Sequence, residues 1–531
     1  MSRSSVKETE MKQAARESAA RPVPGVAAVV MAAGLGKRMQ SKHAKVLHSV
    51  AGRAMVLYSV DLALRVAGHQ IAVIVGHQAD RVSQVIKDAT GHRNGHVPVS
   101  IVEQRELLGT GHAVLQTRPV FVESGRSLPG QFMILNGDTP LLREATLREL
   151  LEVHRRQEAA VTILTAVLDD ASGYGRVVRS SSDECVSRIV EDRDADATVK
   201  VIHEINVGTY VVEGDFLFSS LERLQPSNAQ GEFYLTDIVQ MAVEQGRRVA
   251  AVRLEDSHEG LGVNTRRQLA EAEQVVRRQI RHRWLDAGVR MIDPASTWID
   301  AGVTIGKDSV LYPNVLLEGT TVIGEDTIVR SGTRITDCII GNRVEILDHC
   351  VFRDSQVEDD ATLGPFTHLR PHVLVRKGAK IGNFVEAKKT ELGEGSKANH
   401  LSYLGDAKIG KGVNIGAGTI TCNYDGVRKA ETIIGDGVFI GSDTQLVAPV
   451  TVGAGSVIAA GTTVTLNVPP DSLVISRVTQ VTRPGWAAKR RALVAEGGIP
   501  TSKAGSSSGK RKTGKTGSRR RSAKPSNKRS R

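Results

Sequence analysis

The feature that most limits the fold is a six-residue repeat of apolar side chains in the C-terminal half of the chain. Such a period is typical of a β-solenoid, in which each short strand forms one flat face and its apolar residue points to the axis. Glycine directly follows many of these residues and permits the tight corners of a coil. The repeat occupies sixteen positions in three runs, each of which keeps its phase: Ile305, Leu311, Leu317, Ile323, Val329, Ile335; Leu363, Leu369, Val375, Ile381; and Ile434, Ile440, Leu446, Val452, Ile458, Val464. Unrelated strands with chance spacing would not give three such runs, so we expect a parallel β-helix.

The phase of the repeat breaks near Cys338, Phe384 and Asn423. We expect loops to leave the coil at these three places, where a ligand can be held.

Residues 26–264 have a different pattern, in which short apolar runs alternate with amphipathic stretches. This alternation predicts an α/β domain of βαβ units, with strands at 26–31, 71–75 and 132–135. From 264 to about 288 an apolar stripe at helical spacing follows, formed by Leu269, Ala272, Val276, Ile280 and Trp284. We therefore predict five segments: a disordered extension over 1–25, the α/β domain over 26–264, a linker helix over 265–292, the solenoid over 293–482 and a basic, disordered tail over 483–531.

The net charge of the chain comes from that tail. The 531 residues carry a formal charge of +12, and residues 503–531 contain twelve basic and no acidic side chains. The rest of the chain is neutral, so the charge does not support a nucleic-acid-binding core. Two hypotheses stay open for the tail: salt-sensitive contact with a polyanion, either nucleic acid or an anionic membrane, or a contribution to solubility alone.

The remaining composition predicts a cytoplasmic protein. No apolar run approaches the roughly 20 residues of a membrane span. The segment 1–22 is polar and mixed in charge, so neither a signal peptide nor a transmembrane segment is expected. Four widely spaced cysteines without a Cys-x-x-Cys pair fit reduced thiols and no zinc site.

A glycine-rich turn, MAAGLGKRM over residues 31–39, follows the first predicted strand. Its small side chains let backbone N–H groups approach phosphate oxygens, which Arg38 and Lys45 can neutralise. The spacing of the glycines excludes both the dinucleotide fingerprint and Walker A. A second such turn covers 108–111, and Asp138 stands at the carboxyl end of a predicted strand, where open α/β sheets bind ligands. Asp138 is therefore either a magnesium ligand or a helix N-cap.

These motifs occur in the order seen in sugar-1-phosphate nucleotidyltransferases. From residue 31 to residue 264 the order is MAAGLGKRM, KVLH, LGTGHA, NGD, GYGR, IVE, EIN, GEFYLTD and GVN. Together with the hexapeptide half, they resemble the bifunctional bacterial enzymes of UDP-N-acetylglucosamine synthesis, over roughly residues 26–482. The resemblance implies a Rossmann-like mixed sheet joined by a helix to a left-handed parallel β-helix. Lys37 stands where that family usually has Thr, and Ala44 where it often has Pro.

The resemblance also implies two activities that supply precursors of peptidoglycan and the cell envelope. One is acetyl transfer from acetyl-CoA to glucosamine 1-phosphate. The other is transfer of UMP from UTP to N-acetylglucosamine 1-phosphate, with Mg²⁺ as cofactor and pyrophosphate as leaving group. This second step needs positioning and charge neutralisation more than a protein nucleophile.

For uridylyl transfer, the resemblance assigns Asp138 and Asn264 to Mg²⁺, and Arg38 to support of the phosphates. The residues that it implies for UTP and the sugar nucleotide are Met31, Ala32, Ala33, Gly34, Lys45, Gln104, Gly109, Thr110, Gly175, Glu191, Asn206 and Asn264.

For acetyl transfer, polar residues interrupt the hexapeptides in one zone, and His400 is the candidate general base. An ammonium must lose a proton before it attacks a thioester, and imidazole is a suitable base near neutral pH. A nearby carboxylate such as Glu386 can orient the ring. The resemblance implies Arg370, Lys388, Tyr403 and Asn414 for the sugar phosphate, and Ala417, Asn423, Tyr424, Ser442, Ala460 and Arg477 for acetyl-CoA. A solvated face is the alternative explanation for Arg370 and Lys388.

Hexapeptide acyltransferases form trimers, so the resemblance implies a homotrimer through the β-helix, with acetyltransferase sites shared between chains. Two other functions stay open. The chain is either a different sugar nucleotidyltransferase whose solenoid serves only assembly, or a regulatory subunit with a degenerate nucleotidyltransferase fold. The cluster around His400 argues against the first, and the Asp138–Asn264 pair against the second.

Overall fold

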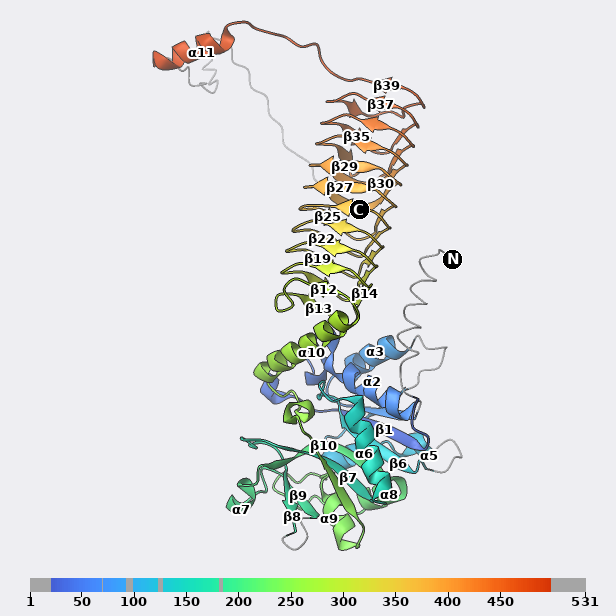
Figure 1. Ribbon diagram of the computed structural model, residues 1–531, viewed down its shortest axis with the longest axis vertical. Helices are drawn as coiled ribbons and strands as arrows, with labels where there is room; N and C mark the ends of the chain where they lie inside the picture. Colours follow the sequence, from blue (N-terminus) through green and yellow to red (C-terminus); the bar gives the residue numbers. More distant parts are fainter. Residues whose placement is uncertain (1–20, 69, 92–98, 123–127, 181–184, 498–531) are drawn as a thin grey trace, which may run out of the picture. The chain divides into compact units, whose positions relative to one another are not determined.

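The computed structural model describes residues 21–68, 70–91, 99–122, 128–180 and 185–497. Its N-terminal part is a mixed sheet with helices on both faces (Figure 1), in the strand order β11-β7-β10-β6-β1-β4-β5, with β8 and β9 attached through β10. The strands are β1 (Val26–Ala32), β4 (Ile71–Val75), β5 (Val99–Glu103), β6 (Gln131–Asn136), β7 (Val161–Val167), β8 (Arg176–Arg179), β9 (Val186–Val190), β10 (Glu204–Glu213) and β11 (Val249–Arg253), and a separate hairpin joins β2 (Ser49–Val50) to β3 (Arg53–Ala54). The helices are α2 (Met55–Ala67), α3 (Ala79–Thr90), α4 (Thr110–Leu115), α5 (Arg118–Val122), α6 (Glu144–Arg156), α7 (Ala197–Lys200), α8 (Gly214–Leu221) and α9 (Asp237–Glu244), with 3-10 turns η1 (Lys37–Met39), η2 (Lys45–Leu47) and η3 (Ser257–Gly260).

The central strands are apolar because both faces of the sheet are covered. Every residue of β4 is buried, and alternate side chains of β1 enter two separate cores. The three strands expected from the sequence are confirmed as β1, β4 and β6. Strand β1 runs parallel to β4 and β6, with Met31 opposite Asn136, so the turns that follow β1 and β6 open at the same edge. Strand β10 runs antiparallel to β6 and β7, which makes the sheet mixed.

A long helix, α10 (Arg266–Asp286), follows this sheet. It begins with a capping box between Thr265 and Gln268, which satisfies backbone N–H groups at its first turn. Its predicted stripe is confirmed: Ala272, Val276 and Ile280 are buried in one core with the first coils.

Beyond α10 the chain winds into a parallel β-helix (Figure 1). Ile305 lies opposite Ile323, and Leu317 opposite Ile335, so three consecutive hexapeptides make one turn of the coil. All sixteen repeat positions are at most 4% exposed. The strands form an eleven-stranded sheet from β12 (Arg290–Met291) to β39 (Leu473–Val474) and a seventeen-stranded sheet from β13 (Trp298–Ile299) to β38 (Thr463–Val464). The predicted fold class is therefore confirmed.

Two of the three predicted loops are wrong. Near Cys338 the coil only loses one residue, because Ile323 lies opposite Ile340 rather than Gly341. Asp337 closes this short corner with a φ of 52°, a conformation that Asp tolerates better than most residues. The coil shortens in the same way just after Phe384, because Val375 lies opposite Leu392 rather than Gly393.

The third predicted loop is present. Ile409 lies opposite Ile434 rather than Val427, so this turn carries an insertion between β32 (Ile420–Cys422) and β33 (Thr432–Ile434). The segment that begins with Asn423 therefore leaves the coil.

The two terminal segments predicted to be disordered, 1–25 and 483–531, lie only partly within the described residues. Residues 1–20 and 498–531, which include the basic stretch, lie outside the described residues, as does the side chain of Lys37. Where the structure does describe these segments, it differs from the prediction. Val23 donates its N–H to the carbonyl of Val66 at 2.7 Å, and α11 (Trp486–Ala495) is a helix. None of the residues of α11 is buried, so its Ala, Arg and Leu content must favour the helix locally.

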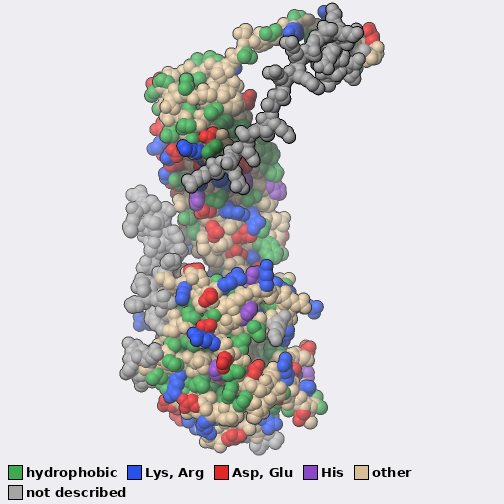
Figure 2. All heavy atoms as spheres, turned by 180° about the vertical axis from the view of Figure 1, so that it is seen from behind, with side chains coloured by type: hydrophobic (Ala, Val, Ile, Leu, Met, Phe, Trp, Pro, Cys, Tyr) green, Lys and Arg blue, Asp and Glu red, His purple; other side chains and the backbone are tan. Residues whose placement is uncertain are grey.

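The chain divides into two compact units, one up to Ser476 and one from Arg477. The described residues contain no helix that is long and apolar enough to cross a membrane. On the face shown in Figure 2, Lys and Arg side chains are interspersed with Asp and Glu side chains, as expected for a neutral body.

Candidate active sites

The edge of the N-terminal sheet where β1 and β6 end opens into a cavity of about 510 Å³. An adjoining cavity of about 450 Å³ shares Lys45, Gly173, Glu191 and Asn264 with it and adds Arg38. The predicted residues that line the first cavity are Met31, Ala32, Ala33, Gly34, Lys45, Gln104, Gly109, Thr110, Asp138, Gly175, Glu191, Asn206 and Asn264. Segments from the first strand to the start of α10 therefore meet at one place.

Asp138 and Asn264, the predicted metal ligands, converge on a single point in this cavity. The ammonium of Lys45 donates to Asn264 Oδ1 at 2.9 Å and forms an ion pair with Asp138. A Cβ at Gly262 would come within 3.3 Å of both carboxylate oxygens of Asp138, so this glycine keeps the approach open.

One carboxylate and one amide oxygen suit a hard divalent cation that fills its shell with phosphate and water. Within the described parts of the chain, no three His, Cys, Asp or Glu side chains gather as a metal site. The donor set therefore fits a metal ion that is shared with a phosphorylated substrate.

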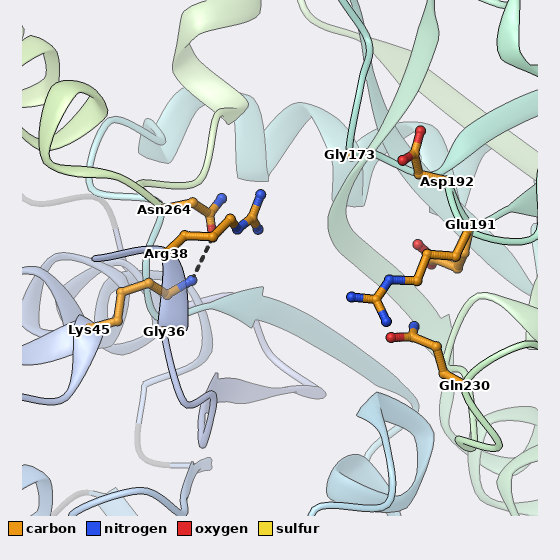
Figure 3. A pocket seen from close by; sticks show the side chains of 9 residues that line it. Gly36, Arg38, Lys45, Gly173, Glu191, Asp192, Gln230 and Asn264 are labelled. Carbon is orange, nitrogen blue, oxygen red and sulfur yellow. Dashed lines mark hydrogen bonds between the residues drawn. The ribbon is translucent and has the colours of Figure 1, made fainter. Parts of the chain in front are cut away.

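The cavity has two chemically different sides, as Figure 3 shows. Lys45, Arg38 and Asn264 extend from one side, and Glu191, Asp192 and Gln230 extend from the other, where a guanidinium lies among them. The cationic side suits phosphates, and the acceptor-rich side suits the hydroxyl and amide groups of a sugar.

The acceptor side is held in place by buried hydrogen bonds. The hydroxyl of Thr236 donates to Glu191 Oε1 at 3.2 Å, and Asn206 Nδ2 donates to the Tyr210 hydroxyl at 2.6 Å. Burial raises the pKa of Glu191 above its ordinary value, and nearby carboxylates add to this effect. At Gly175, a Cβ would come within 3.1 Å of Ile189 Cγ2 and would touch Glu191 Oε2 at 3.4 Å, so glycine leaves more room beside this carboxylate.

Glu191→Gln tests the energetic cost of this buried carboxylate. Because folding raises the pKa of Glu191, the group contributes stability below its unfolded pKa, and this contribution is lost as pH rises through the folded pKa. Gln does not ionise. We expect the variant to melt at a higher temperature than wild type at about pH 7.5 and the difference to vanish near about pH 4, measured by calorimetry. A variant that is equally destabilised at both pH values would contradict the assignment.

The second candidate site lies on the β-helix, on strands of both of its sheets. Asn383 is opposite His400 on the neighbouring turn, and its Oδ1 lies 2.9 Å from Nδ1 of that ring. With Nδ1 donating to Asn383, Nε2 is left unprotonated and can accept a proton. The strands that carry this zone are β25 (His368–Leu369), β27 (Lys380–Asn383), β28 (Glu386–Leu392), β29 (Lys397–His400), β30 (Tyr403–Ile409) and β31 (Asn414–Ile415).

The expectation that Glu386 orients His400 is not met within the chain. Glu386 Oε1 instead accepts from the Arg370 guanidinium at 2.8 Å. A carboxylate prefers the permanently charged arginine, which offers a charge-assisted hydrogen bond. Asn383 takes the place beside the imidazole.

A cationic cluster lies next to this zone. The pKa of Lys388 is lowered by the charge of Lys429 and then by that of Arg370. Lys429 pairs with Tyr424 in an antiparallel bridge inside the inserted loop. Three neighbouring positive charges suit a phosphate group.

Three of the six residues predicted for acetyl-CoA form a column of small side chains on the β-helix. Asp443 N–H donates to Ala417 O at 2.7 Å, and Gly461 N–H donates to Ser442 O at 2.8 Å, so Ala417, Ser442 and Ala460 lie on successive turns. Asn423, in the inserted loop, donates its amide to Asp406. Arg477 is the first residue of the second compact unit.

Comparison with known proteins agrees with both sites. The model of the nucleotidyl transferase family matches residues 27–303, and that of bacterial transferase hexapeptide repeats matches residues 431–465. A bifunctional protein GlmU from Pelobacter propionicus is 50% identical over 461 residues, 87% of this chain and 98% of that protein. Those from Trichlorobacter lovleyi (49%; 88% and 98% of the two chains) and Heliobacterium modesticaldum (47%; 85% and 95%) are similar. The chain belongs to the GlmU family.

Family membership extends along both halves of the chain and establishes its activity. It is a bifunctional transferase of UDP-N-acetylglucosamine synthesis, an acetyltransferase and a uridylyltransferase in one chain. The assembly-only solenoid and the degenerate regulatory subunit are therefore not supported. The nucleotidyltransferase half belongs to a family that uses a divalent metal.

Several residues of the GlmU sites escaped the sequence analysis. In the substrate cavity these are Asp192, Arg193 and Gln230, the first two directly after Glu191. On the β-helix they are Asn383 and Lys429. For Lys429 a signal was present, because it lies in the loop that the broken repeat predicts.

Proposed function

We propose that the uridylyltransferase site uses Mg²⁺ held by Asp138, Asn264 and the phosphates of UTP. The observation that carries this proposal is the convergence of the two side-chain oxygens on Lys45 Nζ. Arg38 and Lys45 then face the phosphates, while Glu191 and Asn206 bind the amino sugar. The cation supplies neutralisation of the charge on the transferring phosphoryl group. The chain itself positions the sugar phosphate for in-line attack, and pyrophosphate leaves.

The metal requirement is tested by pyrophosphate release at increasing Mg²⁺. We expect wild type to be inactive without the ion and Asn264→Ala to need at least about tenfold more of it, because one of two protein ligands is lost. Equal Mg²⁺ dependence of the two proteins would reject Asn264 as a ligand.

For acetyl transfer we propose that His400 Nε2 removes the proton from the amine of glucosamine 1-phosphate. As the new N–C bond forms at the thioester carbonyl, the C–S bond breaks and CoA leaves as a thiolate that takes up a proton. Arg370, Lys388 and Lys429 hold the phosphate, with Tyr403 and Asn414 on the sugar. The small residues Ala417, Ser442 and Ala460, with Asn423 and Tyr424, contact acetyl-CoA.

Asn383 would act as a positioning residue, and Asn383→Asp tests this role. A carboxylate beside the imidazole stabilises its protonated form. We therefore expect the acid limb of the pH profile for CoA release to move to higher pH, with pyrophosphate release unchanged. A loss of rate with an unshifted profile would indicate a structural role only.

We further propose a homotrimer built through the β-helix, with each acetyltransferase site completed by a neighbouring chain. His400 and Tyr424 are exposed in the single chain, which fits a site that a second chain covers. Light scattering that gives the mass of one chain would reject this assembly.

Cys338, Cys350 and Cys422 are free thiols, which fits the reducing cytoplasm.

A further inference from the structure

A third cavity, of about 550 Å³, lies apart from both substrate sites. Its walls are α2, the segment 140–144 and α10, and it shares no lining residue with the two cavities at the sheet edge. We call it the α2–α10 cavity. Its volume is in the range of small-molecule pockets.

The α2–α10 cavity is lined by more cations than its own carboxylates can neutralise. Four arginines but only two acidic residues line it. Arg53 is paired with Asp61 at 2.7 Å, and Arg143 pairs with Glu259.

The other two arginines lack strong partners. Arg65 approaches Glu144 only to 3.8 Å, and that carboxylate binds Arg148 at 2.8 Å. Within the described residues Arg283 has no acidic partner, and its guanidinium lies 4.8 Å from the Trp284 ring centre. Arg283 keeps an exposed surface that a ligand can reach. Partial burial of its guanidinium, and then the charge of Arg65, lower its pKa. Two like charges that share only one distant carboxylate favour an anion between them.

Apart from Gln279, the rest of the lining consists of apolar side chains and Tyr58. Tyr58, Leu141 and Ile280 contribute side chains from three different segments, and Tyr58 is fixed by donating its hydroxyl to Val50 O at 2.8 Å. An inorganic ion would leave these walls unused, whereas a molecule with a ring or alkyl part would cover them.

We propose that the α2–α10 cavity binds a small organic phosphate, with the phosphoryl group between Arg283 and Arg65 and the carbon part against Tyr58, Leu141 and Ile280. This site lies outside both established reactions.

Calorimetric titration of the full chain with phenyl phosphate tests the proposal. Both substrate sites are first filled with UDP-N-acetylglucosamine, CoA and N-acetylglucosamine 1-phosphate. We expect one further site per chain, with affinity at least about tenfold weaker in Arg283→Ala, because a charge-assisted contact is lost. Arg267→Ala, an exposed arginine on the same helix, is the matched control and is expected to bind like wild type.

Inorganic phosphate is the second probe. We expect it to bind at least about tenfold more weakly than phenyl phosphate, because it cannot cover the apolar walls. Equal affinities would overturn the organic-phosphate assignment. The proposal that the α2–α10 cavity binds an anion would be wrong if phenyl phosphate found no further site. It would also be wrong if a folded Arg283→Ala protein bound phenyl phosphate as tightly as wild type.

Discussion

His400→Ala is expected to lower the rate of CoA release by about 10²–10⁴-fold, the usual contribution of a general base. The reason is chemical: without an imidazole the substrate amine keeps its proton and cannot attack the thioester. Pyrophosphate release from UTP and N-acetylglucosamine 1-phosphate should stay at the wild-type rate, because the uridylyltransferase cavity contains no residue of the β-helix strands.

The matched control is His349→Ala, which removes another imidazole of the β-helix. The His349 ring stacks on that of Phe366, with ring centres 5.2 Å apart, and lies outside the His400 zone. Both activities should survive this change. If His400→Ala keeps more than about a tenth of the wild-type rate, another group must be the base.

Asp138→Asn is expected to have the reverse effect of His400→Ala: it should slow uridylyl transfer and leave acetyl transfer unchanged. It removes the charge that faces Lys45 and the carboxylate proposed for Mg²⁺. We expect pyrophosphate release to fall by about 10²–10³-fold, as when one electrostatic contact to a transition state is lost. CoA release from acetyl-CoA and glucosamine 1-phosphate should be unaffected.

Asp88→Asn serves as the control for this change. Asp88 is an exposed carboxylate on α3 that accepts a hydrogen bond from Gln84 at 2.7 Å. A similar loss of rate in both variants would show that Asp138 has no special role.

The sequence predicted the β-helix because its period is visible without knowledge of any contact. Each turn buries residues at positions such as Ile440 and Ile458, and glycine marks many corners. The short corner at Asp337 escaped notice because an Asp in the left-handed conformation does not mark it: Asp308 has the same conformation in a turn of full length. A missing residue in the repeat therefore looked like a loop.

A second short corner explains why Asn383 was missed. In a turn of three complete hexapeptides Gly382 would face His400, but this turn is shorter by one residue, and Asn383 faces the imidazole instead. Contacts between turns thus depend on corner lengths that the apolar repeat alone does not reveal. Glu386 was expected to orient the ring as a nearby carboxylate, yet Arg370 on the neighbouring turn binds it.

The uridylyltransferase cavity was easier to anticipate. Its turns follow predicted strands that share one sheet edge, so Gly34 and Asp138 had to lie close together. Asp192 and Arg193 directly follow Glu191, but they were not found because the resemblance implied only Glu191 at the end of β9.

The central claim, two separate active sites in one chain, is tested most directly by a single assay of the purified protein. The protein is mixed with glucosamine 1-phosphate, acetyl-CoA, UTP and Mg²⁺, and the release of CoA and the release of pyrophosphate are measured separately. We predict that both products appear and that chelation of Mg²⁺ stops pyrophosphate release while CoA release continues. Loss of both products on chelation, or pyrophosphate without any CoA, would contradict the account.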